Sequence, residues 1–300
     1  GDDLVRAAPA LEDIAVIETA SPFRLPGASL TIADLHTVAE LLKRELGGDS
    51  AGAIVVQGTD TIEETAFVLD LLIGGEKPVV VTGAMRGADA PGADGPANLL
   101  AAARTAVSPQ ARGLGVLVVL NDTIHAARFV QKTSTFLPNA FVSLGRGPLG
   151  EVVEGEARIA MRVRRRPVLE GVAADADQPV ALVTVGLADD GRLLGALPGL
   201  GYRGAVIEAM GAGHVPSVMV SPLAELAGAI PLVLSSRVAS GSVFTRTYGF
   251  PGSEIDLVER GLIAGGAVGG IKARLLLSLL LAGGLQGEDL RNTFSVYSDG

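Results

Sequence analysis

Short apolar segments alternate with longer segments of helical periodicity over residues 1–120. Segments that are apolar at almost every position predict strands buried on both faces, and they lie at residues 14–18, 53–56, 78–81 and 116–120. Apolar residues spaced three and four apart predict helices between them, at residues 31–46, 61–73 and 95–106. Buried strands that alternate with helices predict the α/β class, with an open, mostly parallel sheet and helices on both of its faces.

The pattern changes after residue 150. Residues 150–163 predict a hairpin with Glu154-Gly155-Glu156 as its turn and with arginines that we interpret as a solvated face. Residues 166–178 show little periodicity, which is typical of a connection between domains. Beyond them the pattern predicts strands at 180–185, 205–208 and 231–235 and helices at 221–229 and 272–282. The predicted organisation is a larger N-terminal α/β domain over 1–165, a linker over 166–178, and a smaller C-terminal α/β domain over 179–300.

Composition excludes several classes of site and partner. Aromatic residues make up only 4% of the chain, so the core must consist mostly of aliphatic side chains. The net charge of −9 argues against a nucleic-acid partner, because phosphate backbones are bound by Lys and Arg. The absence of cysteine excludes disulfides and thiolate zinc sites. The three histidines are far apart in sequence, so we do not expect a metal site.

Membrane association is also not expected. The apolar stretch at residues 275–282 is too short to span a bilayer. No charged and then apolar leader opens the chain. The cytoplasm is therefore the default location.

Candidate chemistry gathers where the predicted strands of the first domain end. In open parallel sheets, ligands bind beyond the carboxyl ends of the strands. Polar loops follow three such ends, at residues 57–65, 82–86 and 121–133. Because these ends meet at one edge of the sheet, we expect the three loops to converge.

The first of these loops is the most informative. Gly58 allows a ligand to approach the backbone closely. Thr59 and Asp60 lie where a helix begins, and free N–H groups and the helix dipole favour an anion there. Helix capping is the alternative interpretation, and such patterns are common. Two overlapping capping-box patterns occur here, Asp60-x-x-Glu63 and Thr61-x-x-Glu64.

Lys132 is the candidate base for this loop. A threonine hydroxyl is a poor nucleophile unless a base removes its proton, and a buried lysine can serve as that base. The chain has four lysines, and only Lys132 falls in a predicted strand-end loop that also carries hydroxyl residues. The alternative is a solvated surface lysine.

At these residues the sequence resembles the bacterial-type L-asparaginase family. Gly58-Thr59-Asp60-Thr61-Ile62-Glu63-Glu64-Thr65 is similar to the second active-site motif of that family. The similarity covers essentially the whole chain. Supporting segments are residues 83–86, 94–99, 115–123, 132–133 and 235–238.

The resemblance implies an amidohydrolase without a cofactor. Its substrate would be a small amino-acid amide, L-asparagine and also glutamine, and its reaction would release ammonia through an acyl-enzyme. By position, the resemblance makes Thr59 the hydroxyl of a Thr-Lys-Asp group, Lys132 its base and Asp60 their partner.

The resemblance also implies the substrate-binding residues and the assembly. Gly58, Thr59 and Asp60 would contact the substrate, Asp60 through its α-ammonium group. Ala84 would supply a backbone contact, and Glu254 would be the acid that a neighbouring subunit directs at the same ammonium. The family forms homotetramers, each a dimer of dimers.

Two departures from the family stand out. The family begins with a strand and a Thr-Gly-Gly-Thr-Ile motif, whose second threonine is the nucleophile. These 300 residues contain no such motif, so we expect the chain as given to be inactive for want of that nucleophile and its strand. The substrate-binding serine of the family corresponds to Gly27, and Ser29 is the candidate substitute.

Two other functions remain open at this point. A non-catalytic protein that binds or senses an amino acid is favoured by the missing nucleophile and opposed by the retained Thr59, Asp60 and Lys132. The amidase subunit of a tRNA-dependent amidotransferase would carry a further N-terminal domain and a tRNA partner, which the acidic charge does not support.

Overall fold

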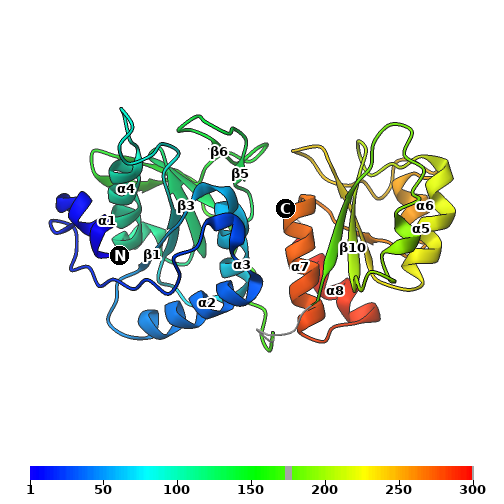
Figure 1. Cartoon of the computed structure of the whole chain (residues 1–300), viewed down its shortest axis with the longest axis horizontal. Helices are drawn as coiled ribbons and strands as arrows, with labels where there is room; N and C mark the ends of the chain where they lie inside the picture. Colours follow the sequence, from blue (N-terminus) through cyan, green and yellow to red (C-terminus); the bar gives the residue numbers. More distant parts are fainter. Residues whose placement is uncertain (173–177, 299–300) are drawn as a thin grey trace. The chain divides into compact units, whose positions relative to one another are not determined.

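The computed structural model describes residues 1–172 and 178–298. The chain divides into two compact units, Gly1–Val168 and Leu169–Gly300 (Figure 1). The predicted linker, residues 166–178, lies partly outside the described residues. Each unit contains its own sheet, and each is α/β in class.

The first unit is built on a six-stranded sheet that is parallel in one half and antiparallel in the other. The three parallel strands come from the predicted alternation of strands and helices, and hairpins add the antiparallel half. Across the sheet the order is β1 (Ala53–Val56), β2 (Val79–Thr82), β3 (Val116–Leu120), β4 (Thr123–Ala126), β7 (Gly150–Val153) and β8 (Glu156–Ile159).

The helices of the first unit lie on both sides of this sheet (Figure 1). Helix α2 (Ile32–Gly47) begins at a capping box between Thr31 and Asp34. Helix α3 (Ile62–Leu72) packs between α2 and the strands β2 and β3, which explains why most of its residues are buried. Helix α4 (Gly95–Val107) contributes its alanines to a separate cluster with β2 and β3. A short N-terminal helix, α1 (Asp2–Ala7), precedes the turn that packs on α4.

The strand predicted at residues 14–18 is wrong. Ile14 lies in a turn, residues 15–18 are irregular, and the side chain of Val16 is 96% exposed. Ile14 and Ile17 pack instead against the small cluster around Leu11. A strand needs a hydrogen-bonded neighbour, and among the described residues β1 at the edge of the sheet pairs with β2 alone.

The predicted hairpin at 150–163 is confirmed, with β7 and β8 paired across Glu154 and Gly155 at positive φ. Its arginines are not simply solvated. Arg162 donates to the carbonyl oxygens of Gln110 and Arg112 at 2.7 and 2.5 Å. Arg165 donates to the carbonyl oxygens of Ile73 and Gly75, just beyond the end of α3. These bonds tie the segment after β8 to the first unit.

The second unit contains a four-stranded parallel sheet between helices. Helix α7 (Gly270–Ala282) packs against the sheet and against α8 (Gly287–Ser298), so its leucine-rich stretch is buried. Two further helices are α5 (Val220–Ala227) and α6 (Glu254–Glu259). The strand order is β12 (Ile263–Ala264), β11 (Leu232–Ser236), β10 (Gly204–Ala209) and β9 (Val180–Thr184).

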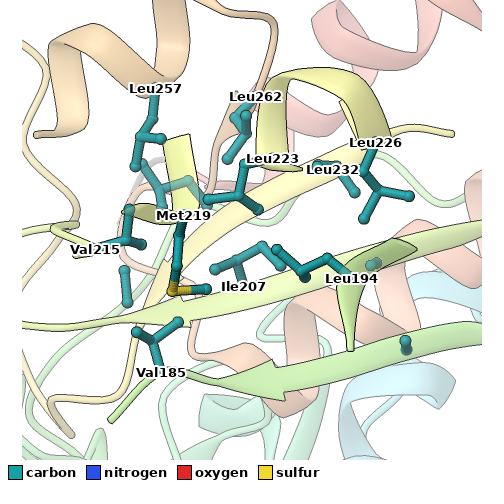
Figure 2. Packing of buried hydrophobic residues seen from close by; sticks show 14 of the residues in the cluster. Val185, Leu194, Ile207, Val215, Met219, Leu223, Leu226, Leu232, Leu257 and Leu262 are labelled. Carbon is teal, nitrogen blue, oxygen red and sulfur yellow. The ribbon is translucent and has the colours of Figure 1, made fainter. Parts of the chain in front are cut away.

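The core of the second unit is aliphatic, as the composition predicted (Figure 2). Each fully buried leucine, isoleucine or valine stabilises the fold by about 1.5–3 kcal/mol. The central members, all with less than one-tenth of their surface exposed, include Val185, Leu194, Ile207, Met219, Leu223 and Leu232.

The remaining predicted strands and helices are confirmed with ends that differ by one or two residues. In the described part of the chain, no helix combines the length and apolarity that crossing a bilayer requires. Within the same residues, no group of three His, Asp or Glu side chains is arranged to hold a metal ion.

Candidate functional site

Lys132 reaches the loop that follows β1. It lies on β5 (Gln131–Lys132), which pairs antiparallel with β6 (Phe141–Val142) in a short ribbon. Its Nζ donates to Thr59 Oγ1 at 2.9 Å and lies 3.2 Å from Asp60 Oδ1, although 73 and 72 residues separate these groups in sequence. The Lys132 side chain is 18% exposed and that of Asp60 is 69% exposed. The structure thus brings together the three residues for which a catalytic role is predicted.

The side chain of Thr61 does not cap α3, contrary to the capping interpretation of this residue. Thr61 precedes the first residue of α3, but its side chain makes no capping hydrogen bond. Its hydroxyl donates instead to the carbonyl oxygen of Gly27 at 3.0 Å. Glu63 accepts from the backbone N–H of Lys132, and Asp60 accepts from the ammonium of Lys132. Thr61, Glu63 and Asp60 are therefore each bonded to a residue of another loop or strand.

Gly83 brings the loop after β2 against the loop after β1. A Cβ atom at Gly83 would lie 2.4 Å from the carbonyl oxygen of Gln57 and 3.4 Å from the Thr59 side chain. A larger residue would therefore separate the two loops. Ala84 follows and is half-buried at the same edge of the sheet. Gly58 itself is exposed, and a Cβ there would meet only Gly27 N, at 3.8 Å.

Asn98 and Asp94 fix the second and third loops, and sequence reasoning treated them only as part of the family resemblance. The buried Asn98 donates to the carbonyl oxygen of Gly83 at 2.9 Å and accepts from the N–H of Asn121 at 2.8 Å. Asp94 accepts from the N–H groups of Met85 and Arg86. Burial acts to raise the pKa of Asp94, but these hydrogen bonds outweigh it and hold the pKa below its usual value. The signal was the short spacing of Asp94 and Asn98 at the start of a predicted helix.

Asn121 and Asp122 form a turn. Their φ angles of 50° and 55° place both in the left-handed region, as a two-residue hairpin turn requires. That turn lets β4 fold straight back along β3. From the third loop, Lys132 reaches the first loop.

Gly27 and Ser29 lie on the loop before α2. A Cβ at Gly27 would lie 3.1 Å from both Gly58 O and Thr61 Oγ1, so the hydroxyl of Thr61 and the amide of Gln57 crowd the place of a serine side chain. Ser29, the candidate substitute, is exposed. In the described ranges its hydroxyl makes no hydrogen bond to residues 57–61.

Glu254 belongs to the second unit, where it is completely buried at the start of α6. Its Oε1 accepts from the N–H groups of Thr247 and Tyr248, and its Oε2 lies 3.2 Å from His214 Nε2. Burial acts to raise the pKa of Glu254, but these hydrogen bonds lower it below its usual value, which favours the carboxylate. The rings of Tyr248 and Phe250 pack edgewise on His214. Sequence reasoning missed His214 because nothing in its spacing connects it to an acid 40 residues away.

Comparison with known proteins places this arrangement in a family. Residues 1–165 match the family model described as "Asparaginase, N-terminal", and residues 179–294 match the "Glutaminase/Asparaginase C-terminal domain". The chain belongs to the asparaginase family. The resemblance in the loop after β1 therefore reflects family membership along the whole chain.

The asparaginase relatives cover nearly all of the chain. It is 37% identical to the "Probable L-asparaginase" of Deinococcus radiodurans, over 96% of this chain and 88% of that protein. It is 33% identical to the "Glutaminase-asparaginase" of Acinetobacter glutaminasificans, over 99% of this chain and 90% of the relative. It is 32% identical to the "Probable L-asparaginase periplasmic" of Haemophilus influenzae, over 93% and 80% of the two chains.

Proposed function

We propose that this protein hydrolyses the side-chain amide of L-asparagine, with L-glutamine as a second substrate, and releases ammonia. The observation that supports this most directly is the group formed by Lys132, Thr59 and Asp60, with Lys132 Nζ at 2.9 and 3.2 Å from the other two. Relatives named L-asparaginase and glutaminase-asparaginase support the choice of substrates.

The reaction we propose proceeds through an acyl-enzyme. A threonine oxygen attacks the amide carbon, the carbon–nitrogen bond breaks, and water then cleaves the ester to release aspartate. In this proposal Lys132 is the general base, which takes the proton of the hydroxyl and delivers it to the departing ammonia. Thr59 lies within hydrogen-bond distance of Lys132 and carries the proton between the lysine and the reacting atoms.

Asp60 suits the α-ammonium of the substrate. Asp60 is mostly exposed, so its carboxylate is accessible to a ligand while one oxygen contacts Lys132. Each charge-assisted hydrogen bond to the ammonium contributes about 1.5–3 kcal/mol. We assign Glu254 to the same ammonium from a neighbouring subunit, and we assign Gly58 and Ala84 to backbone contacts with the substrate.

The test is ammonia release from L-asparagine and L-glutamine by the protein expressed from its natural start codon. We expect hydrolysis of asparagine, and loss of it in Lys132→Met. Lys43→Met, which removes a lysine from the exposed surface of α2, is the control. Absence of ammonia from both amides would contradict the proposal.

A second candidate is a protein that binds an amino acid without catalysis. The observation that favours it is the absence of a Thr-Gly-Gly-Thr-Ile motif from the 300 residues. Calorimetric titration with L-aspartate distinguishes the two functions, because this candidate predicts binding of aspartate without ammonia release.

We also propose a dimer of dimers that acts in the cytoplasm, with the domain boundaries given by residues 1–165 and 179–300. The two family-model matches support these boundaries. Light scattering tests the assembly. Cell fractionation tests the compartment, since one relative is named periplasmic.

A further inference from the structure

Glu63 is hydrogen-bonded to the backbone of Lys132, the residue whose side chain contacts Thr59 and Asp60. Its Oε1 accepts a hydrogen bond of 3.1 Å from the N–H of Lys132, 69 residues further along the chain. Glu63 lies in the first turn of α3 and is half-buried. The start of α3 and the loop before it therefore contact Lys132 at both ends, through its backbone N–H and through Nζ.

Lys132 needs such an anchor because its own strand is short. β5 and β6 are two residues long each, so few hydrogen bonds between the strands fix the backbone of Lys132, and the bond from Ser143 to His125 anchors the partner side of the ribbon rather than Lys132 itself. The adjoining bond, from Thr133 N to Ala140 O at 2.7 Å, stays within the ribbon and does not tie it to α3. A lysine side chain also has four rotatable bonds, so its ammonium is placed accurately only if its backbone is fixed.

We infer that Glu63 is a positioning residue for Lys132, which sets the distance from the lysine ammonium to Thr59. This rests on the proposed role of Lys132 as the base. The hydrogen bond to the N–H of Lys132 requires an acceptor oxygen at the distance that a glutamate side chain spans. It does not require the negative charge of Glu63. A displacement of about 1 Å at a catalytic group can cost up to about a hundredfold in rate.

Two variants of Glu63 distinguish the effect of its side-chain length from the effect of its negative charge. Glu63→Gln keeps the acceptor oxygen at the same distance and removes the charge, whereas Glu63→Asp keeps the charge and shortens the side chain by one methylene. We expect Glu63→Asp to lower kcat about tenfold with little change in KM, and Glu63→Gln to stay close to wild type. Glu45→Ala is the control, because it removes a negative charge from the exposed surface of α2, away from Lys132.

A second measurement does not depend on turnover. Acetic anhydride acetylates free lysine amines, and mass spectrometry gives the rate at Lys132 relative to the exposed Lys43 in the same sample. In the wild-type chain, Nζ of Lys132 is bound by two oxygens and mostly buried, so its acetylation should be slow. Glu63→Asp should raise that relative rate several-fold, and Glu63→Gln should leave it unchanged. Equal thermal unfolding midpoints in both variants show that the fold is kept.

The outcomes distinguish this inference from the proposed function. Wild-type protein that releases no ammonia contradicts the function, while the acetylation rates still decide whether Glu63 anchors Lys132. The inference would be overturned if Glu63→Asp kept both the acetylation rate of Lys132 and the kcat of the wild type. It would also be overturned if Glu63→Gln and Glu63→Asp lowered kcat equally. A rise in KM with unchanged kcat would also overturn it, because Glu63 would then serve substrate binding.

Discussion

His125 on β4 is joined to Ser143 by a hydrogen bond of 2.9 Å between Nδ1 and Oγ, and both side chains are buried. Ser143 follows β6, the partner of the strand that carries Lys132. The bond therefore connects the lysine ribbon to the main sheet. The other ring nitrogen of His125 is buried and has no hydrogen-bond partner among residues 1–172 and 178–298, so a charged ring would be poorly accommodated.

Stability should fall as His125 is protonated. Burial lowers the pKa of His125 from 6.5 to about 4. Between these values the unfolded chain binds the proton and the folded chain does not, so the free energy of unfolding decreases as the pH falls from about 6.5 towards 4. The full effect is roughly 3 kcal/mol. Urea unfolding at several pH values in this range measures it.

The control is His125→Asn, which keeps a polar group beside Ser143 and cannot titrate. This variant should show a clearly shallower decrease in stability over the same range, whatever its stability at pH 7. If its pH dependence equals that of wild type, another group is responsible.

Lys132 should be essential for turnover and dispensable for folding. Lys132→Met removes the amine that contacts Thr59 and Asp60 while keeping a side chain of similar length. Loss of a general base should lower kcat at least about a hundredfold. Ammonia release and the thermal unfolding midpoint are measured together, with Lys43→Met as the control. Near-normal turnover in Lys132→Met would remove this residue from the mechanism.

Asp60 and Glu254 should each contribute to the binding of L-aspartate, the product. Asp60→Ala should weaken binding by about tenfold or more, the equivalent of about 1.5–3 kcal/mol for a charge-assisted hydrogen bond. Glu254→Gln should weaken it similarly, and this substitution keeps an oxygen for the N–H groups of Thr247 and Tyr248. Calorimetric titration gives both affinities.

Glu254 also tests the assembly. If a neighbouring subunit supplies it, a monomeric variant with Glu254 intact should bind aspartate as weakly as Glu254→Gln does. Unchanged affinity in Glu254→Gln would show that the assignment of this residue is wrong.

The sequence predicted those elements whose identity depends on local pattern. The alternation of buried strands and helices from Ala53 to Leu120 appears in the structure almost residue for residue. The strand at 14–18 failed because its apolar residues find a hydrophobic cluster but no hydrogen-bonded neighbour. β4 was missed because Asn121 and Asp122 looked like polar residues at a strand end, whereas their positive φ angles make them a hairpin turn.

The site was accessible to prediction only in part. Thr59 and Asp60 could be chosen because they follow a buried strand at the edge where strand ends meet, whereas Lys132 lies on β5, beyond the missed strand β4, rather than in the predicted strand-end loop. The hydrogen-bond partners of Glu63 and Glu254 could not be predicted. The bond from the N–H of Lys132 to Glu63 and the contact of His214 with Glu254 depend on loop conformation rather than on residue spacing. Thr61 shows the same limit, since it occupies a capping position but its hydroxyl donates to the carbonyl oxygen of Gly27 instead of capping the helix.

The last prediction concerns the nucleophile. The 300 residues contain no Thr-Gly-Gly-Thr-Ile segment, and we expect them by themselves to release no ammonia from asparagine. Thr59 and Lys132 would then form a proton-transfer pair that lacks the hydroxyl nearest to the amide.

The measurement compares the 300-residue chain with the protein expressed from its natural start codon, at equal concentration and with asparagine as substrate. Activity in the protein expressed from its natural start codon, and not in the 300-residue chain, would support the prediction. Equal activity in both would contradict it, and Thr59 would then be the nucleophile, since it is the hydroxyl bound by Lys132. In that case Thr59→Val should abolish turnover in both, while Thr61→Val, which removes a hydroxyl bound to Gly27 instead, should leave the acyl-enzyme chemistry in place.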